Sequence, residues 1–343
     1  MSATMHDVAR LAEVSIKTVS NVLNDYPYIR PQTKQRVLDA IETLGYRPNL
    51  TARGLRSGRT GLISLIIPDL RNAYFAELAD TVMKAAEPQG LSVIIAQSGG
   101  DRERELELLH GPRMQMVDGI LFSVLALSQS DVSLLSDVPT PMVLLGERIM
   151  QGPVDHVTMR NSEGVKAATE HLIAQGRRRI LAFGAHPEQG LGSAELRLRG
   201  YWEAIIGAGL PVDESLVVSV RGWFHARGAA AMRGFLDGGV TFDGMVAFND
   251  AIAIGAMRVL QAAGVRVPED VAVIGYDDID ETRYTLPTLS TINPGRDEIA
   301  EVAVRYLSER IAQPDSAASP RYHLSHFELV QRESSKVRNV ATR

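Results

Sequence analysis

The sequence predicts an all-α helix-turn-helix headpiece followed by a two-lobed α/β body with parallel sheets. Residues 1–60 hold three helical patterns, and from Gly61 onward short apolar runs alternate with helical stretches. Strands that alternate with helices at this spacing indicate parallel sheets with helices on both faces. Eight strand candidates within residues 61–343 indicate two lobes rather than a single sheet.

The composition excludes several classes of protein. Of the 343 residues, 45% are hydrophobic and 22% are charged, as in an average soluble globular protein. Cysteine is absent, so disulfides, thiolate metal sites and cysteine nucleophiles are excluded. No apolar run reaches the roughly 18 residues of a membrane helix, and the N-terminus lacks the profile of a signal peptide. We therefore expect a soluble, cytoplasmic protein with no membrane partner.

Charge is distributed unevenly along the chain. Residues 1–60 hold nine Lys or Arg against five Asp or Glu, a net charge of +4, whereas the whole chain carries −5. Residues 61–343 therefore carry −9. A basic head on an acidic body is typical of a protein that contacts a polyanion with one end, although a solvated basic face would give the same count.

Caps and apolar stripes define three short helices in the headpiece. Thr4 and Asp7 have the spacing of a capping box that begins the first helix. Ser15 is the expected N-cap of the second helix, about Ile16–Asn24, and Pro31 begins the third. The expected core stripes of the first and third helices are Val8, Leu11 and Ala12, and Val37, Leu38, Ile41 and Leu44. Three short helices, the first two joined by a tight turn, form a helix-turn-helix unit.

The outer face of the second helix is polar but carries little charge. A helix face that is merely solvated would more often carry Glu and Lys, whereas short hydrogen-bonding side chains suit base edges and phosphates. A small helical domain that binds another protein is the alternative. The face consists of Lys17, Ser20, Asn21 and Asn24, with Ile16 and Thr18 on its flanks.

These patterns resemble the headpiece of LacI/GalR-family transcriptional regulators. The resemblance rests on two runs, one from Asp7 through Ser15 to Leu23-Asn24 and one from Thr33 through Arg36-Val37 to Leu44-Gly45-Tyr46-Arg47-Pro48-Asn49. It implies that Ile16, Lys17 and Asn21 face base edges and that Tyr28 makes a further DNA contact. Contacts to phosphates are implied for Thr4, Ser15, Thr18, Ser20, Asn24 and Thr33. Isoleucine is unusual at a position that faces base edges. Ile16 could contact a thymine methyl group or pack against the backbone.

The segment from Asn49 to Arg56 is either a plain interdomain linker or a helix that forms on DNA. A helix this short is unstable alone, and Gly54 costs it about 1 kcal/mol. The run Ala52-Arg53-Gly54-Leu55 resembles the hinge helix of the same family, which folds on the operator. The resemblance implies that paired hinge helices lie in the minor groove, where Leu55 wedges between the central base pairs and bends the duplex. The candidate DNA contacts of this segment are Asn49, Ala52, Arg53 and Leu55.

Polar and aromatic side chains follow the expected strands of the body. These strands are Leu62–Ile67, Leu91–Ile95, Gly119–Phe122, Met142–Leu145, Ile180–Phe183, Val217–Val220, Met245–Phe248 and Val271–Ile274. Ligands of open α/β sheets lie beyond the carboxyl ends of the strands, and amides, carboxylates and aromatic rings there suit a polyhydroxylated ligand. Any one of them alone could be a helix cap, whereas the set favours a binding site. The set is Asp69, Asn72, Tyr74, Phe75, Gln97, Ser98, Ser123, Glu147, Arg148, Asn249, Asp250, Asp277 and Asp278.

Residues 61–343 also resemble the effector domain of the LacI/GalR family, which has the fold of periplasmic sugar-binding proteins. Matching stretches include Arg197-Leu198-Arg199-Gly200-Tyr201 and the run from Val267 to Asp278. The resemblance implies that Arg197, Asn249 and Asp277 bind ligand hydroxyls, that Trp223 stacks on the ligand, and that Tyr74 and Phe75 close the opposite side. It also implies the domain limits. These are a helix-turn-helix domain at 1–48, a hinge and linker at 49–60, an N-lobe at about 61–160 and 292–322, and a C-lobe at about 161–291 and 323–343.

One departure from the family bears on the ligand. The family usually has Asp-Asn where this chain has Arg160-Asn161, so the charge at the first position is reversed. Arg160 could line the cleft and favour an acidic or phosphorylated sugar.

The expected function is that of a sequence-specific DNA-binding regulator. Motifs of metalloproteases, P-loop enzymes, serine hydrolases and dinucleotide-binding enzymes are missing, so we expect neither an enzyme nor a cofactor or metal. A sugar-transport protein would be exported and would have no use for residues 1–60. Residues 336–343 lack leucine heptads, so we expect a homodimer. We expect a repressor of carbohydrate-utilisation genes that a small sugar-like effector releases from a palindromic DNA operator. The alternative is a corepressor-type or global regulator that responds to a phosphorylated metabolite or a nucleobase.

Overall fold

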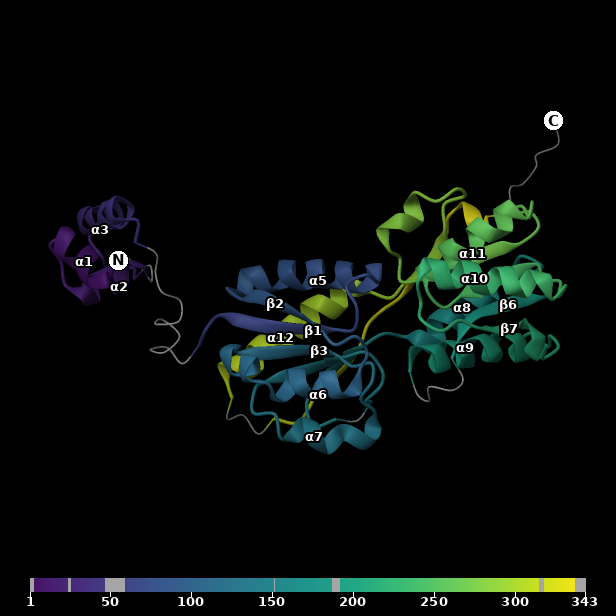
Figure 1. Ribbon diagram of the computed structural model, residues 1–343, viewed down its shortest axis with the longest axis horizontal. Coiled ribbons are helices and arrows are strands. Elements are labelled where there is room, and N and C mark those ends of the chain that lie inside the picture. The colour runs from purple at the N-terminus through teal and green to yellow at the C-terminus, as the bar shows by residue number, and fades with distance from the viewer. Residues whose placement is uncertain are drawn as a thin grey trace. The chain divides into compact units, whose positions relative to one another are not determined.

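The computed structural model describes residues 3–23, 26–46, 59–150, 152–186, 192–314 and 318–336. The chain forms two compact units, Met1–Thr60 and Gly61–Arg343 (Figure 1). Among the described residues, no helix is both long enough and apolar enough to cross a membrane.

The described residues of the first unit form three helices. They are α1 (Met5–Leu11), α2 (Ile16–Leu23) and α3 (Pro31–Leu44). The expected capping box is present, since the Asp7 amide donates to Thr4 Oγ1 at 3.3 Å and the Thr4 amide donates to Asp7 Oδ2 at 3.0 Å. Ser15 caps α2 by accepting the Thr18 amide at 3.1 Å. The helix-turn-helix part of the expected fold class is therefore confirmed.

The expected core stripes were wrong at two positions, which are exposed rather than buried. Leu11 and Leu38 are 50% and 41% exposed, whereas Val8 and Val37 are fully buried. In α1 the buried face includes Ala9 and Ala12, which lie on the opposite flank of Val8 from Leu11 at 100° per residue. In α3 the buried face runs through Val37 and Ala40, and Leu38 lies about 100° away from Val37.

Two six-stranded sheets form the described part of the second unit, one in each lobe. The N-lobe sheet has the order β11-β5-β4-β3-β1-β2, and the C-lobe sheet has the order β12-β10-β9-β8-β6-β7. Every pairing is parallel except that of β12 with β10. The N-lobe strands are β1 (Leu62–Ile67), β2 (Ser92–Gln97), β3 (Gly119–Ser123), β4 (Met142–Leu145), β5 (Asp155–Thr158) and β11 (Tyr322–Leu324). The C-lobe strands are β6 (Ile180–Ala185), β7 (Val217–Ser219), β8 (Gly244–Ala247), β9 (Ala272–Tyr276), β10 (Ser290–Asn293) and β12 (Glu328–Val330).

Helices cover both faces of each sheet (Figure 1). In the N-lobe, α5 (Ala73–Ala86) and α12 (Arg296–Ala312) pack on one face, and α6 (Arg102–His110) and α7 (Val132–Ser136) pack on the other. In the C-lobe, α10 (His225–Asp237) and α11 (Asp250–Ala262) cover one face, and α8 (Asn161–Ala174) and α9 (Ser193–Gly207) cover the other. The expected two-lobed α/β fold with parallel sheets is therefore confirmed.

The eight expected strands all form, within about two residues at either end. Four described strands were not expected: β5, β10, β11 and β12. Strand β5 begins at Asp155, whose carboxylate has no exposed surface and is held by Arg310 and Arg321, each at 2.7 Å. A charged residue at a fully buried position hides the apolar pattern of a core strand. Strands β11 and β12 are only three residues long.

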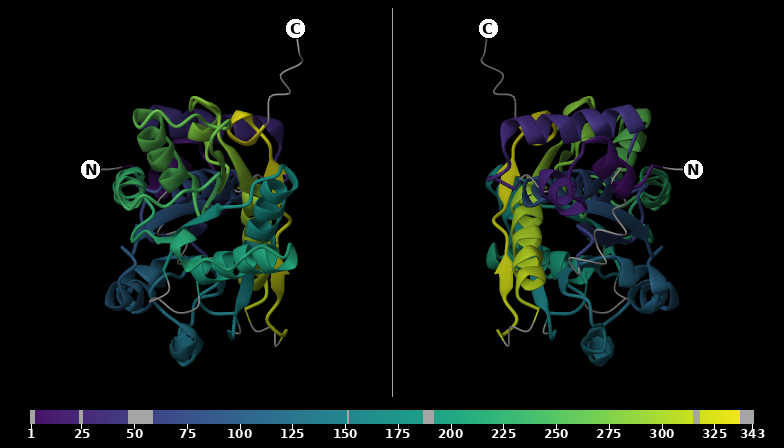
Figure 2. Two further views of the ribbon diagram at one scale, coloured as in Figure 1. Left: turned by 90° about the vertical axis from the view of Figure 1, so that its right-hand side faces the viewer. Right: turned by 90° about the vertical axis from the view of Figure 1, so that its left-hand side faces the viewer.

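Over its described residues the chain passes between the lobes three times. The passages follow β5, β10 and β11. The last of them belongs to the yellow C-terminal segment, which Figure 1 shows between the lobes and Figure 2 shows in views from either end. Because β10 ends at Asn293 and β11 at Leu324, the second and third passages lie about two residues beyond the expected lobe limits. Each lobe is thus built from segments that lie far apart in the sequence.

Close packing between α8 and α9 depends on Gly200. A Cβ at Gly200 would lie 2.0 Å from the carbonyl oxygen of Ser162, a backbone atom that cannot rotate away. We expect Gly200→Ala to lower the free energy of unfolding by about 1–3 kcal/mol in urea denaturation, because α9 must shift away from α8. Gly207→Ala, at the end of the same helix with no described atom within 4 Å, is the matched control. Equal stability of the two variants would contradict this packing.

Candidate functional site

The outer face of α2 is the candidate DNA-binding surface of the first unit. Lys17 is exposed, and Ser20 and Asn21 are half-buried beside it. Tyr28 is 82% exposed, with its ring 5.6 Å from that of Tyr26. This surface carries short hydrogen-bonding groups and a cation, which can contact base edges and phosphates.

The remaining candidates of this unit have local roles or lie outside the described residues. Thr4 and Ser15 cap their helices, Ser15 Oγ lies 2.9 Å from Thr18 Oγ1, and Thr33 is half-buried on α3. Ile16 is half-buried and packs against the headpiece core. Asn24, Asn49, Ala52, Arg53 and Leu55 lie outside the described residues. The contacts of all these residues with DNA remain predictions.

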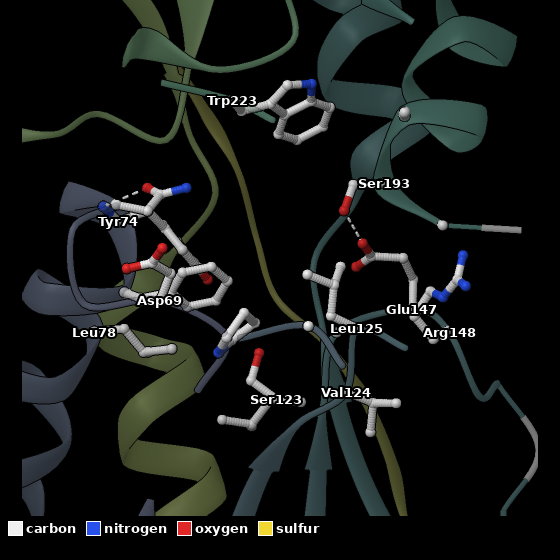
Figure 3. A pocket seen from close by; sticks show the side chains of 18 of the residues that line it. Asp69, Tyr74, Leu78, Ser123, Val124, Leu125, Glu147, Arg148, Ser193 and Trp223 are labelled. Atoms are coloured by element: carbon white, nitrogen blue, oxygen red, sulfur yellow. Dashed lines mark hydrogen bonds between the residues drawn. The ribbon is translucent and has the colours of Figure 1, made fainter. Parts of the chain in front are cut away.

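A cavity of about 560 Å³ lies between the two lobes of the second unit (Figure 3). It opens at the carboxyl ends of the parallel strands, where ligands of this class of sheet bind. Eight of the expected effector contacts line it: Asn72, Tyr74, Phe75, Ser123, Glu147, Arg197, Trp223 and Asp277. Residues from both lobes therefore share one cavity.

A buried ion pair forms the C-lobe wall of the cavity. Arg197 Nη2 lies 3.8 Å from Asp277 Oδ1, and both side chains are at most 7% exposed. The guanidinium of Arg197 lies 3.6 Å from the ring centroid of Tyr276 and donates from Nε to Asn161 Oδ1 at 2.7 Å. These contacts fix the guanidinium, which leaves the Asp277 carboxylate facing the cavity.

Burial raises the pKa of Asp277 to about 7. Arg197 and Arg296 oppose this shift, and the negative charges of Glu77 and Glu147 add to it. At 3.8 Å the contact with Arg197 is too long for a hydrogen bond, so the loss of hydration outweighs the ion pair. Hydroxyl groups of a ligand that donate hydrogen bonds to Asp277 would stabilise the ionised form of its carboxylate.

Glu147 of the N-lobe accepts hydrogen bonds from two residues of the C-lobe. Its Oε1 accepts a hydrogen bond from Ser193 Oγ at the start of α9, and its Oε2 accepts from Asn161 Nδ2 at 3.2 Å. Figure 3 shows the Ser193–Glu147 contact at one side of the cavity. A ligand at this side of the cavity would therefore contact a hydrogen bond that joins the two lobes.

Aromatic rings supply apolar faces on both lobes. The indole of Trp223 donates to the carbonyl of Gly184 at 3.1 Å and stacks on His186 with a centroid distance of 5.6 Å. On the N-lobe, the rings of Tyr74 and Phe75 meet edge to face at 5.3 Å. Burial raises the pKa of Tyr74, so its hydroxyl stays protonated. Such rings suit the apolar face of a sugar.

Three expected effector contacts are not among the residues that line the cavity. Ser98 is buried and accepts the Gly100 amide at 3.3 Å, as a turn residue does. Asn249 caps α11 by accepting the Ile252 amide at 3.0 Å. Arg160 donates to Glu163 at 3.2 Å and does not line the cleft in this structure. Their roles in effector binding remain predictions.

The cavity also contains residues that the sequence did not assign to it. Asp69 and Arg148 belong to the set of strand-end residues but were not named as effector contacts. His186 directly follows β6 and was left out of that set, and Ser193 and Phe224 do not follow a strand. These two residues begin and precede helices, respectively. No group of three His, Asp or Glu among the described residues is arranged to hold a metal ion.

Both units match families of known proteins. Residues 4–49 match the bacterial regulatory proteins of the lacI family, and residues 169–335 match a periplasmic binding protein-like domain. The ribose operon repressor of Escherichia coli K12 is 34% identical over 91% of this chain and 94% of its own. The chain belongs to the lacI family of bacterial regulatory proteins.

Solved structures of LacI-family proteins agree with this assignment. A putative transcriptional regulator of Sanguibacter keddieii is 49% identical, with a TM-score of 0.75 over 80% of this chain and 98% of its own. The transcriptional regulator CelR in its cellobiose complex is 31% identical, with a TM-score of 0.71 over 97% of this chain and 100% of its own. As a LacI-family member, this chain is a DNA-binding transcriptional regulator and not an enzyme.

Proposed function

We propose that this LacI-family regulator is a homodimeric repressor of carbohydrate-utilisation genes that a sugar-like effector releases from a palindromic operator. The observation that carries the proposal is the cavity between the lobes, where a buried carboxylate and aromatic rings face a common space. The ribose operon repressor and the CelR–cellobiose complex, both similar to this chain, support a sugar as effector. The protein would act in the cytoplasm, where its operator is accessible.

The mechanism links the cavity to the headpiece. Each α2 would lie in the major groove of one half-site, because the two-fold symmetry of a dimer is mirrored in a palindrome. Paired Leu55 residues would wedge into the minor groove at the centre and bend the duplex. Effector binding would close the two lobes, move the paired N-lobes and unfold the hinge helices. The operator would then be released.

Fluorescence anisotropy tests this function directly. The operator is first selected from a random palindromic DNA library, and its complex is then titrated with sugars and sugar phosphates. We expect one neutral sugar to release the DNA. A compound that tightens binding would instead favour the corepressor alternative. If no palindrome is enriched at moderate salt, the proposal of specific operator binding fails.

Effector affinity is expected to depend on pH through Asp277. Ligand hydroxyls that donate to its carboxylate favour the ionised form, so binding releases a proton when the pH lies below its pKa of about 7. The dissociation constant should fall as the pH rises from 5.5 to 7, by up to tenfold per unit, and level off above 7.5. Calorimetric titrations across this range check the slope, which Asp277→Asn should abolish. A slope that survives in Asp277→Asn would show that the proton comes from a group other than Asp277.

A further inference from the structure

Among the described residues, several contacts join the lobes around the cleft, and three of them lie at different places on its rim. Ser193 of the C-lobe donates to Glu147 of the N-lobe on one side. The Asp280 amide of the C-lobe donates to Glu77 Oε1 on α5 at 2.8 Å. At the third place, the guanidinium of Arg71 lies 5.3 Å from the ring centroid of Phe224. The lobes therefore meet around the cavity, which corresponds to the closed arrangement that effector binding would favour.

The space that remains is large for a single sugar ring. A CHOH unit takes up about the volume of one water molecule, about 30 Å³, so a six-carbon sugar fills about 180 Å³ and a disaccharide about 360 Å³. The cavity measures about 560 Å³ while the three contacts are in place. One ring would leave about two thirds of it to water.

The two ends of the cavity differ in chemistry, and each suits one ring. At the C-lobe end, Trp223 offers an aromatic face within reach of the Arg197–Asp277 pair, since the guanidinium lies 5.1 Å from the indole centroid. Figure 3 shows Ser123 at the opposite end, with Tyr74 on one side of the space between and Leu125, Glu147 and Arg148 on the other. A hydroxyl, a leucine side chain, a carboxylate and a guanidinium there offer both hydrogen-bond acceptors and donors for the hydroxyls of a second ring.

We propose that the effector is a disaccharide, with one ring on Trp223 and Asp277 and the second ring between Tyr74 and Leu125. This inference rests on the proposed function, because it names the class of sugar that the same cavity takes. A sugar acid or phosphate would depend on Arg148, the other arginine among the described residues that line the cavity, because Arg160 pairs with Glu163 outside it and three donor atoms of Arg197 are engaged by Asn161, Phe248 and Met159.

Isothermal titration calorimetry of the full chain tests the size of the ligand. The disaccharides are cellobiose, maltose, lactose, melibiose, trehalose and sucrose, and the monosaccharides are glucose, galactose, fructose, xylose and ribose, with glucose 6-phosphate as the charged probe. We expect one disaccharide to bind at least tenfold more tightly than either of its component monosaccharides. A monosaccharide or the phosphate that binds as tightly as any disaccharide would overturn the inference.

A pair of leucine variants tests where the second ring lies. Leu125 and Leu70 are both 44% exposed, but only Leu125 lines the cavity. Leu125→Trp should fill the second position and weaken disaccharide binding at least tenfold, whereas Leu70→Trp should leave it within twofold. Unchanged disaccharide affinity in Leu125→Trp would overturn the placement.

Failure of the inference can be told apart from failure of the proposed function. If a monosaccharide both binds and releases the operator, the disaccharide is wrong and the sugar-responsive repressor stands. If the operator is bound but no sugar of either size binds, the sugar-responsive function itself fails, and the disaccharide fails with it.

Discussion

Replacing Asp277 by asparagine is expected to abolish the effector response. The variant loses an acceptor charge that is 5% exposed and faces the cavity, and the amide presents donors where ligand hydroxyls would donate. Hydrogen bonds to a charged group contribute about 1.5–3 kcal/mol each, so the affinity for the effector should fall by more than tenfold. Operator affinity without effector should stay within twofold, as measured by fluorescence anisotropy.

The control for this variant is Asp280→Asn. Asp280 lies three positions further along the chain, its side chain is 69% exposed, and it does not line the cavity. It should respond to the effector like the parent protein. Arg197→Ala removes the opposite partner of the pair and should also lose the response. If Asp277→Asn still releases DNA at the parent effector concentration, the proposed ligand contact is incorrect.

Leu55→Ala is expected to cost specific DNA affinity far more than non-specific affinity. If Leu55 wedges between base pairs, it stabilises only a bent duplex, and the unstacking that it supports is worth a few kcal/mol. We expect the dissociation constant for the selected operator to rise at least tenfold, while that for random DNA changes less than twofold. Binding to random DNA depends mainly on phosphate contacts, so its dependence on salt should not change.

The same pair of DNA probes shows how this prediction can fail. Equal losses on operator and random DNA would remove the wedging role from Leu55. Circular permutation of the operator gives a second readout, because a lost wedge should reduce the bend of the bound DNA. An unchanged bend in Leu55→Ala would lead to the same conclusion.

The fold could be predicted wherever a local pattern follows the period of its element. The eight expected strands are apolar runs that alternate with helices, and they form within about two residues of their limits. Strand β5 was not predicted, because it begins with the charged residue Asp155. Two arginines bury this carboxylate, Arg310 of α12 and Arg321 before β11, and both lie more than 150 residues away in the chain. Leu11 and Leu38 were misplaced because small alanines occupy the buried faces of α1 and α3. Only tertiary contacts decide such positions.

The candidate site was predictable to the extent that sheet topology brings strand ends together. Glu147, Asp277 and Ser123 follow or end parallel strands, and all three line the cavity. Asn249 shows the limit of this reasoning, since the same position equally suits a helix cap, which is what it forms. His186 directly follows β6, so the same reasoning could have found it. Ser193 could not be found, because its contact with Glu147 depends on how one lobe meets the other. That orientation leaves no periodic trace in a sequence.

The passages between the lobes also bear on how the chain reaches its folded state. The N-lobe sheet is completed by β11, and the C-lobe sheet by β10 and β12, all of which lie beyond residue 289. During synthesis, neither lobe can close its sheet until most of the chain has left the ribosome. The unpaired edge strands of both sheets stay exposed during that time, so the newly made protein depends on the two lobes completing their folding together. A nonsense mutation near residue 320 would leave each sheet one strand short.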